Sequence, residues 1–500
     1  MVLTRTMMRA AIAAVLPLSL AGVGTVVTAA PAAASGSNRP GGWQNSATGT
    51  TGPTSLKDVR SIIGADTGVA SLLTGAGVGV ALLDTGVVPV SGLPAKQIVN
   101  GPDLSFESQA DGLRYLDSYG HGTHMAGIIV GNDTASGSKG LAPGAKLTSV
   151  KLGTANGAVD VSQVIAAIDW VVANKDADPA NPIRVINLSY GSGGNPSSTT
   201  DPLQFAVEQA WKAGIVVVAA AGNDGAAAGT LDDPATDPFV LSVGAADTNG
   251  TVSTADDEVA EFSSSGSAAR PVDVLAPGES IISLRDPGSS IDVDYPAARV
   301  GDTLFRGSGT SQATAITSAA VALLLQARPW LTPDQVKNLL KRGTSLTGSR
   351  TTELNVGKAL GLIADPSSTQ KFRASTGNGK LDDARGDSRV LSNNIPLSGE
   401  NSVWGPFRSA NWAAFAAQKR SWVRGTWMGS TIAGTGWTGA SWASKTWGAA
   451  AWAGGPWGGT PTWSDPSWSI RRWSSARWST TDWSGARYTA GVDWATSTWG

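Results

Sequence analysis

The 500-residue chain contains no cysteine and only two histidines. The absence of cysteine excludes disulfide bonds, and with neither cysteine nor a third histidine a zinc site is not expected. Imidazole is the usual acid–base group near neutral pH, so such chemistry is confined to His121 and His124, which lie three residues apart. The scarcity of histidine therefore directs the search for a catalytic site to residues 120–127, where small neighbours leave His121 accessible.

Long apolar runs are also absent, apart from one at the N-terminus. Arg5 and Arg9 precede this run, and small residues follow it, a pattern that predicts a secretory signal peptide over residues 1–34 and an extracellular protein. A retained membrane anchor is the alternative, although Pro17 weakens the run as a stable span. Residues 35–55 are expected to be a short flexible segment, too short for a folded pro-region.

A carboxylate and a nucleophile accompany His121 as candidates. The apolar run at residues 78–83 predicts a buried parallel strand, and Asp84 follows it at the carboxyl edge of the sheet, where catalytic groups gather. Ser311 stands at the start of an apolar helix, where free N–H groups and the helix dipole favour developing negative charge. The chain thus presents the order Asp84, His121, Ser311.

This order, with the motifs Asp-Thr-Gly, Gly-His-Gly-Thr-His and Gly-Thr-Ser, resembles the subtilisin-like serine proteases, or subtilases, whose known residue order it matches. The resemblance implies that Ser311 attacks a peptide carbonyl, His121 transfers the proton and Asp84 holds the imidazole. It also implies protein or peptide substrates, no nucleic-acid partner and no cofactor for the chemistry. Structural calcium is common in the family, but no loop here has a convincing ligand spacing.

The resemblance implies further site residues. Asn223 follows an apolar run at residues 215–221, and its side-chain amide is implied to bind the oxyanion together with the backbone N–H of Ser311. His124 is implied to be structural. Substrate-binding positions are implied at Asp117, Ser189, Tyr190, Gly191 and Gly222. Asp117 also fits a solvated turn acid, and Tyr190 also fits a residue that only packs.

The nucleophile segment departs from the usual family pattern at Gln312 and Ala315, where Met and Pro are common. Alanine is a good helix former, so we expect Ala315 to have a small structural effect. The polar Gln312 is the more consequential change, because it could alter the fit of the substrate.

Strands alternate with helices through the part of the chain that resembles the family, residues 56–365. This alternation predicts an α/β fold of three layers, with a parallel sheet covered by helices on both faces. Thr332 predicts the cap of a terminal helix, followed by Pro333 in its first turn. Further predicted core elements are strands at residues 148–152 and 184–189 and helices at residues 161–175 and 203–213.

Tryptophan is concentrated at the C-terminus: sixteen of the twenty lie in residues 401–500, and from Trp437 most recur every five residues. Residues spaced five apart do not share one face of an α-helix or one face of a β-strand. The residues between the tryptophans are rich in Gly, Ser and Thr, which does not favour a helix. A β-solenoid is the first prediction for this Trp-rich module, residues 404–500; a row of short strands is the second and a disordered tail the third. Residues 366–403 predict a polar linker, so a chain ending near Pro366 is expected to remain an active peptidase.

The last hundred residues hold nine Lys or Arg and three Asp, a net charge of +6, against −2 for the whole chain. Such a basic aromatic module could bind glycans, anionic wall polymers or membranes through stacking and charge; alternatively, the tryptophans form its core. Two functions therefore stay open. One is a secreted serine endopeptidase, and the other is a surface or wall-binding protein that acts mainly through the tail, beside a weak or silent subtilase domain.

Overall fold

The computed structural model describes residues 54–431, except 109–112, 194–198, 347–348, 387–388, 393–394 and 424. All of the described residues belong to one compact unit. The predicted signal peptide, nearly all of the short segment after it, and the Trp repeat from Trp437 onward lie outside the described residues.

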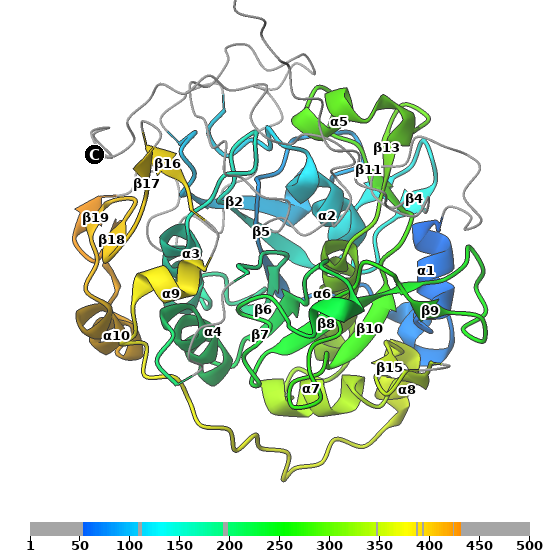
Figure 1. Ribbon diagram of the computed structural model, residues 1–500. Helices are drawn as coiled ribbons and strands as arrows, with labels where there is room; N and C mark the ends of the chain where they lie inside the picture. Colours follow the sequence, from blue (N-terminus) through cyan, green and yellow to red (C-terminus); the bar gives the residue numbers. More distant parts are fainter. Residues whose placement is uncertain are drawn as a thin grey trace, which may run out of the picture. The chain divides into compact units, whose positions relative to one another are not determined.

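A mainly parallel sheet forms the centre of the described part of the chain (Figure 1). Its strands follow the order β14-β15-β10-β8-β7-β6-β1-β5-β2, and only the pairs β14–β15 and β8–β9 are antiparallel among those described. The strands are β1 (Gly79–Asp84), β2 (Ile98–Asp103), β5 (Lys146–Lys151), β6 (Ile183–Leu188), β7 (Val216–Ala220), β8 (Leu241–Asp247), β9 (Glu258–Val259), β10 (Val274–Pro277), β14 (Thr344–Ser345) and β15 (Thr352–Glu353).

Strand β1 is the point at which the order of the sheet reverses. Later strands are added beside it on both sides, with Leu82 opposite Ser149 of β5 and opposite Asn187 of β6. In α/β sheets such a switch point leaves a crevice at the carboxyl ends of the strands, where ligands bind. Asp84 is the last residue of β1 and therefore lies at this crevice.

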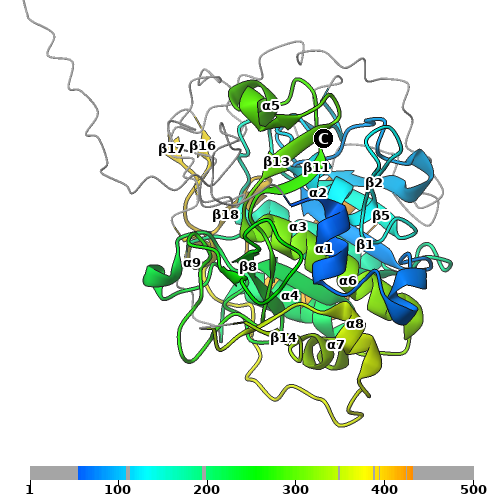
Figure 2. The ribbon, with the colours of Figure 1, turned by 90° about the vertical axis from the view of Figure 1, so that its right-hand side faces the viewer.

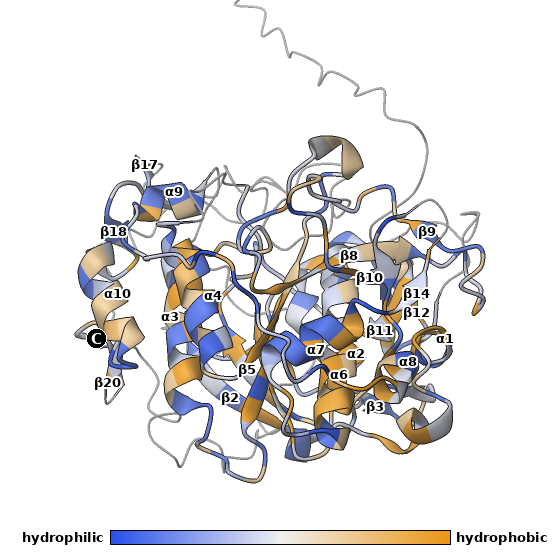
Figure 3. Ribbon diagram, turned by 90° about the horizontal axis from the view of Figure 1, so that it is seen from below, coloured by the Kyte–Doolittle hydropathy of each residue, from blue (hydrophilic) through white to orange (hydrophobic). Residues whose placement is uncertain are grey.

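Helices cover the sheet on both faces, as predicted (Figures 1 and 3). Helices α2 (His121–Val130) and α6 (Thr310–Ala327) pack on one face, α6 against β6, β7, β8 and β10. Helices α3 (Val161–Asn174) and α4 (Pro202–Lys212) pack on the other and against each other. Figure 2 shows α6 running beside the strands, behind α1 (Leu56–Ile62).

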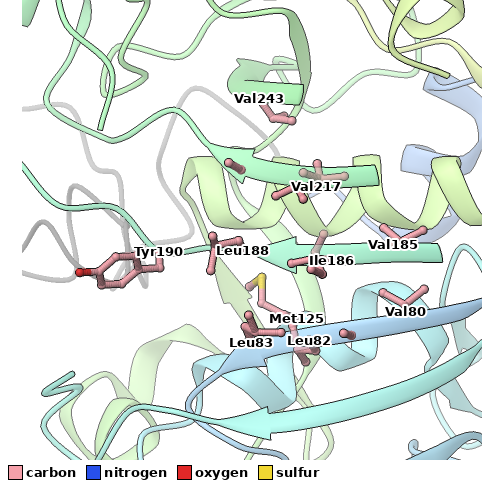
Figure 4. Packing of buried hydrophobic residues seen from close by; sticks show 14 of the residues in the cluster. Val80, Leu82, Leu83, Met125, Val185, Ile186, Leu188, Tyr190, Val217 and Val243 are labelled. Carbon is pink, nitrogen blue, oxygen red and sulfur yellow. The ribbon is translucent and has the colours of Figure 1, made fainter. Parts of the chain in front are cut away.

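The core explains why these segments are strands and helices. All five residues of β7 are buried, and its β-branched valines suit a strand enclosed on both faces. Figure 4 shows Met125 of α2 among Leu82, Leu83 and Ile186, so side chains of β1, β6 and α2 share one apolar cluster. Each such fully buried side chain contributes about 1.5–3 kcal/mol relative to exposure.

Smaller elements complete the domain. Thr332 caps α7 with a capping box and Pro333 occupies its first turn, so that prediction is confirmed. The remaining elements of this part are α5 (Ser290–Asp294), α7 (Pro333–Leu340), α8 (Val356–Gly361), β3 (Asn132–Asp133), β4 (Ser138–Lys139), β11 (Ile281–Leu284), β12 (Arg299–Val300) and β13 (Leu304–Gly307).

Residues 366–431, which we call the C-terminal extension, fold onto the same domain. Figure 1 shows α9 and α10 beside α3 and α4. Helix α9 contacts both α3 and α4, and α10 contacts α4. Leu381 and Leu397 are buried in the same apolar core as the sheet. The elements of the extension are α9 (Leu381–Arg385), α10 (Ser409–Ala417), β16 (Leu391–Ser392), β17 (Ile395–Pro396), β18 (Asn401–Ser402), β19 (Gly405–Pro406), β20 (Trp422–Val423), β21 (Thr426–Trp427) and β22 (Ser430–Thr431).

The prediction of a linker at residues 366–403 is therefore wrong. Arg385, a fully buried residue of this segment, pairs with buried Asp160 at 2.6 Å and fixes the segment to the start of α3. The segment looked unable to pack because its composition is polar. Its polar groups find buried partners instead, so the reason for placing a domain end near Pro366 does not hold.

The described beginning of the Trp-rich module, residues 404–431, contains the helix α10 followed by three short antiparallel strands. Trp422 pairs with Trp427 between β20 and β21, and Thr426 pairs with Thr431 between β21 and β22. Met428 and Gly429 both have positive φ angles, 50° and 89°, as a tight two-residue hairpin turn requires. The three strands are of the kind that the second alternative describes, whereas α10 fits none of the three alternatives. The β-solenoid, the row of short strands and the disordered tail all stay predictions for the repeat itself.

Candidate active site

The Asp84–His121 pair is the centre of the site. His121 is the first residue of α2, and its Nδ1 lies 2.7 Å from Asp84 Oδ1. Both side chains are buried, so water competes little for this hydrogen bond. The same carboxylate oxygen accepts a hydrogen bond from the backbone N–H of Thr85 at 2.8 Å, which fixes its orientation. Two residues 37 positions apart in the sequence thus meet as predicted.

The glycines around His121 allow this close approach. A Cβ on Gly122 would lie 2.1 Å from the carbonyl oxygen of Gly86 and 3.1 Å from Asp84 Oδ1. Gly120, the N-cap of α2, has φ of 105°, in the left-handed region that favours glycine. The Gly-His-Gly sequence is therefore needed for packing and backbone conformation at the start of α2.

Asp117 organises the same helix start. Its buried carboxylate accepts hydrogen bonds from the Thr85 hydroxyl and from the backbone N–H groups of Tyr119, Gly120 and Thr123, at 2.7–3.1 Å. The reading of Asp117 as a solvated turn acid is therefore wrong. A role as a subsite acid stays a prediction, but the contacts that the structure gives Asp117 cap α2 and so position His121.

Thr85 is a site residue that the sequence reading did not single out. Its hydroxyl accepts from the backbone N–H of Gly122 at 2.9 Å and donates to Asp117 at 2.8 Å, which links the end of β1 to the start of α2. The only signal was its place after Asp84, because the partners of a hydroxyl cannot be predicted from local sequence.

Ser311 lies in the first turn of α6, fully buried. Helices α2 and α6 pack against each other, so His121 and Ser311 each occupy the N-terminal turn of one of two neighbouring helices. The N–H groups of a first helical turn have no partner within the helix and favour negative charge. This setting can activate a serine and stabilise an oxyanion beside it.

Asn223 is oriented for the predicted oxyanion role. Its Oδ1 accepts a hydrogen bond from the backbone N–H of Thr310 at 2.9 Å, which ties it to the start of α6. Since the donor is a backbone N–H, this bond also fixes which amide atom is oxygen. Asn223 Nδ2 is buried without a hydrogen-bond partner among the described residues, a donor of the kind that a developing oxyanion requires.

The predicted substrate-binding segments lie at the ends of two neighbouring strands. Ser189, Tyr190 and Gly191 follow β6, and Gly222 follows β7, two residues beyond its end. The Ser189 hydroxyl donates to the carbonyl oxygen of Ser311 at 3.4 Å, so this segment touches the nucleophile's own backbone. Tyr190 is fully buried, and Figure 4 shows its ring beyond Leu188 with the hydroxyl directed away from the apolar cluster.

His124 is one turn along α2 from His121 and is fully buried. Burial, and then the neighbouring His121, lower the pKa of His124 to about 3. It is therefore neutral at the pH at which an imidazole base works, in keeping with its predicted structural role.

Gln312, next to Ser311, is a second buried amide. Both of its side-chain polar atoms lack a hydrogen-bond partner among the described residues. Ala315 continues α6 without interruption, as expected from its helix propensity.

The described residues contain no group of three or more His, Cys, Asp or Glu side chains arranged to hold a metal ion. No helix among them is both long enough and apolar enough to cross a membrane.

The comparison of this sequence with protein families matches it to one described as the subtilase family, over residues 75–379. The chain belongs to the subtilase family. The sequence of this subtilase is 41% identical over 279 residues to the serine protease AprX of Bacillus subtilis (strain 168), covering 54% of this chain and 62% of AprX. It is 34% identical over 281 residues to subtilisin DY of Bacillus licheniformis, covering 56% of this chain and 88% of that protein.

A solved structure is also similar to this subtilase. Fervidolysin from Fervidobacterium pennivorans, a keratinolytic enzyme related to subtilisin, matches with 27% identity and a TM-score of 0.49, over 62% of this chain and 46% of that one. The family match and the observed sheet and helices confirm the subtilisin-like α/β fold predicted from the sequence.

Proposed function

We propose that this subtilase is a secreted serine endopeptidase that hydrolyses peptide bonds of protein or peptide substrates through an acyl-enzyme. The observation that carries the proposal is the buried hydrogen bond between Asp84 and His121 at 2.7 Å. A carboxylate bound to Nδ1 leaves Nε2 as the nitrogen that exchanges a proton with a nucleophile. Ser311, at the start of the neighbouring helix, carries the hydroxyl from which such a base takes a proton.

The reaction follows in two halves. Ser311 Oγ attacks the carbonyl carbon while His121 Nε2 takes the hydroxyl proton; the same proton then goes to the leaving amine as the C–N bond breaks. Water attacks the resulting ester in the second half and gives a proton to His121, which passes it to Ser311 Oγ as the acyl C–O bond breaks and the acid is released. Asp84 orients the imidazole and stabilises the imidazolium in both halves.

Two donors are available for the oxyanion of each tetrahedral intermediate. Asn223 Nδ2 has no other partner among the described residues, and the Ser311 N–H belongs to a first helical turn. A donor that contacts the oxyanion but not the flat ground-state carbonyl lowers the barrier to the chemical step.

Secretion is the second part of the proposal, and it rests on the charged start and apolar run of residues 1–34. The rival function, glycan, wall-polymer or membrane binding by the Trp-rich tail, rests on residues outside the described part. The described tryptophans Trp412 and Trp427 are buried and give their indole N–H groups to Asp169, so they favour a packing role.

Hydrolysis of internally quenched peptides by the purified mature protein tests the proposal. Wild type should cleave them, while Ser311→Ala, His121→Ala and the double variant should fall by a similar large factor, because the triad acts as a unit. Thermal melting of each variant controls for folding. Turnover by Ser311→Ala near the wild-type rate would place the nucleophile elsewhere, and an inactive wild type of intact fold would favour the binding function.

A further inference from the structure

A buried lysine lies next to the end of the strand that carries Asp84. Lys151 ends β5 as Asp84 ends β1, and these two residues are partners in the parallel pairing of the strands. The Lys151 side chain is buried, and its Nζ donates to the carbonyl oxygen of Thr85 at 2.8 Å. Burying an ammonium group is costly, so a lysine in this place needs a partner of opposite charge.

Glu107 supplies that charge. Its Oε2 lies 3.0 Å from Lys151 Nζ, and both side chains are buried, so water competes little for this charge-assisted hydrogen bond. The same oxygen accepts from the Ser118 hydroxyl at 2.6 Å, and Oε1 accepts from the backbone N–H of Ala155 at 2.8 Å. Glu107 therefore holds the ammonium of Lys151 in one position and joins the chain after β5 to the chain before α2.

The carbonyl that Lys151 binds belongs to the residue that orients Asp84. The backbone N–H of Thr85 donates to Asp84 Oδ1 at 2.8 Å, and this is the oxygen that also binds His121 Nδ1 at 2.7 Å. Thr85 is held at its carbonyl by Lys151 and at its hydroxyl by the N–H of Gly122. These two attachments fix the orientation of Thr85, and with it the direction of its N–H.

We infer that Lys151 is a positioning residue for the Asp84–His121 pair. It acts through the carbonyl of Thr85, and Glu107 holds its ammonium where this contact forms. This inference rests on the proposed peptidase function and adds a residue that aligns its machinery. Alignment is important for rate, because a misplacement of about 1 Å in a catalytic site can cost about 10²-fold.

The charge of Lys151 also affects the acids around it. Burial raises the pKa of Asp103, and Lys151 opposes that shift. Burial and then Asp117 raise the pKa of Asp286, and Lys151 again acts in the opposite direction. A neutral side chain at position 151 would therefore remove a counter-charge from buried acids as well as the contact with Thr85. A test must separate these two effects.

Kinetics of Lys151→Met test the contact itself. Methionine keeps most of the apolar stem but lacks the ammonium. We expect kcat on an internally quenched peptide to fall by about 10- to 100-fold, with KM within about twofold of wild type, because the change disturbs alignment rather than substrate binding. A folded Lys151→Met with the wild-type kcat would overturn the inference.

Lys146→Met is the matched control. Lys146 begins β5, and its Nζ donates to the carbonyl oxygen of Lys96 at 2.8 Å, so this variant removes the same kind of hydrogen bond at the other end of the same strand. Its kcat should stay within about twofold of wild type, as for a surface substitution. An equal fall in both variants would mean that any disturbance of β5 lowers the rate, and the inference would fail.

The double variant Lys151→Met/Glu107→Gln separates alignment from charge. It removes both buried charges together, so its melting temperature should lie closer to wild type than that of Lys151→Met. Its kcat should stay low, because the contact with Thr85 is still missing. Recovery of the wild-type kcat would show that only the unpaired charge of Glu107 matters, which overturns the inference. If Lys151→Met does not fold, the double variant carries the kinetic test.

Nuclear magnetic resonance reads the pair without turnover. The chain has only two histidines, so selective nitrogen-isotope labelling of histidine gives signals from His121 and His124 alone. A Ser311→Ala background prevents self-cleavage during the measurement. The proton on His121 Nδ1, which its hydrogen bond to Asp84 moves far downfield, reports the alignment of the pair, and the His124 signals report the integrity of α2.

The proton signal of His121 should shift or broaden in Lys151→Met and in the double variant but not in Lys146→Met, while the His124 signals stay unchanged in all three. An unchanged His121 signal in Lys151→Met would overturn the inference and leave the peptidase function standing. An inactive wild type of intact fold would overturn the peptidase function, and the histidine signals would then decide the inference alone.

Discussion

The two faces of the central sheet are held in different ways. On one face, α6 is buried from Thr310 to Leu325 and packs through alanine, leucine and valine side chains, with its first turn given to the site. On the other face, the C-terminal extension is fixed to α3 by polar groups. Arg385 pairs with Asp160, and the indoles of Trp412 and Trp427 donate to one oxygen of Asp169 at 2.7 and 2.8 Å.

This difference teaches how far sequence alone determines each region. The α6 face is formed from continuous apolar runs, so it can assemble from local pattern and burial. The extension is held by pairs more than 200 positions apart, such as Arg385 with Asp160 and Trp412 with Asp169.

Removing the extension should have the largest effect. A chain ending at Asp365 loses the buried cover of α3, and we expect the free energy of unfolding to fall by an amount on the order of 5 kcal/mol, which for a domain of this size lowers the melting temperature by about 6–8 °C. The reference is a chain ending at Thr431, melted under the same conditions in a Ser311→Ala background to prevent self-cleavage. Equal melting temperatures would make the extension an appendage.

Breaking one buried ion pair should have the second largest effect on stability. Arg385→Met leaves Asp160 buried without its partner, and we expect a loss of about 3–5 kcal/mol in the free energy of unfolding measured with urea. Arg389→Met is the control, because Arg389 pairs with Asp382 where both are partly exposed, and it should cost less than about 1 kcal/mol. Similar losses in the two variants would contradict an anchoring role for Arg385.

On the α6 face of the sheet, the prediction concerns catalysis rather than stability, and it is made for Asn223. Asn223→Ala should lower kcat by about 10²- to 10³-fold, or about 2.7–4 kcal/mol, with little change in KM or melting temperature; this magnitude is the one measured for subtilisin, a member of the same family. Steady-state kinetics on one quenched peptide supplies the measurement. An effect confined to KM would mean that Asn223 binds the ground state.

The smallest effect concerns the pH dependence of the indole–carboxylate contact. Burial raises the pKa of Asp169 to about 6, although its bonds to Trp427, Trp412 and Ser421 oppose the shift. A folded pKa above the unfolded value near 3.9 gives stability that is present below pH 3.9 and lost as pH rises through 6. Between pH 4 and 7.5 the free energy of unfolding of the wild type should therefore fall by about 2–3 kcal/mol relative to that of Asp169→Asn.

Urea unfolding at both pH values measures this difference. Asp176→Asn, which removes an exposed acid just after α3, serves as the control and should follow the wild type. A constant gap between wild type and Asp169→Asn would show that Asp169 does not titrate in this range.

The sequence predicts most of the site and little of the extension, for physical reasons. Asp84, His121 and Ser311 each end or begin a strongly patterned element, so the fold brings them to one edge. Asn223 follows a strand in the same way. Asp117 was predicted as a site residue, but its four hydrogen bonds depend on a turn whose geometry the sequence does not show.

The extension could not be predicted because its segments have no continuous apolar face. Residues 366–403 are polar. Arg385 can hold this segment in place only because it pairs with Asp160, and local sequence pattern cannot predict a partner so far away in the chain. The five-residue spacing of tryptophan begins at Trp437, outside the described residues. Trp412 and Trp427, which precede the regular repeat, serve as packing and hydrogen-bonding groups for α3. Contacts between residues far apart in the sequence therefore determine the structure of this region.

Labelling of the nucleophile tests the central claim most directly. The mature protein is treated with a fluorophosphonate, digested with an unrelated protease and examined by peptide mass spectrometry. A single adduct on Ser311 is predicted in the wild type, with none in Ser311→Ala and much slower labelling in His121→Ala. A wild type of intact fold that takes up no label, or an adduct that persists in Ser311→Ala, would contradict the account.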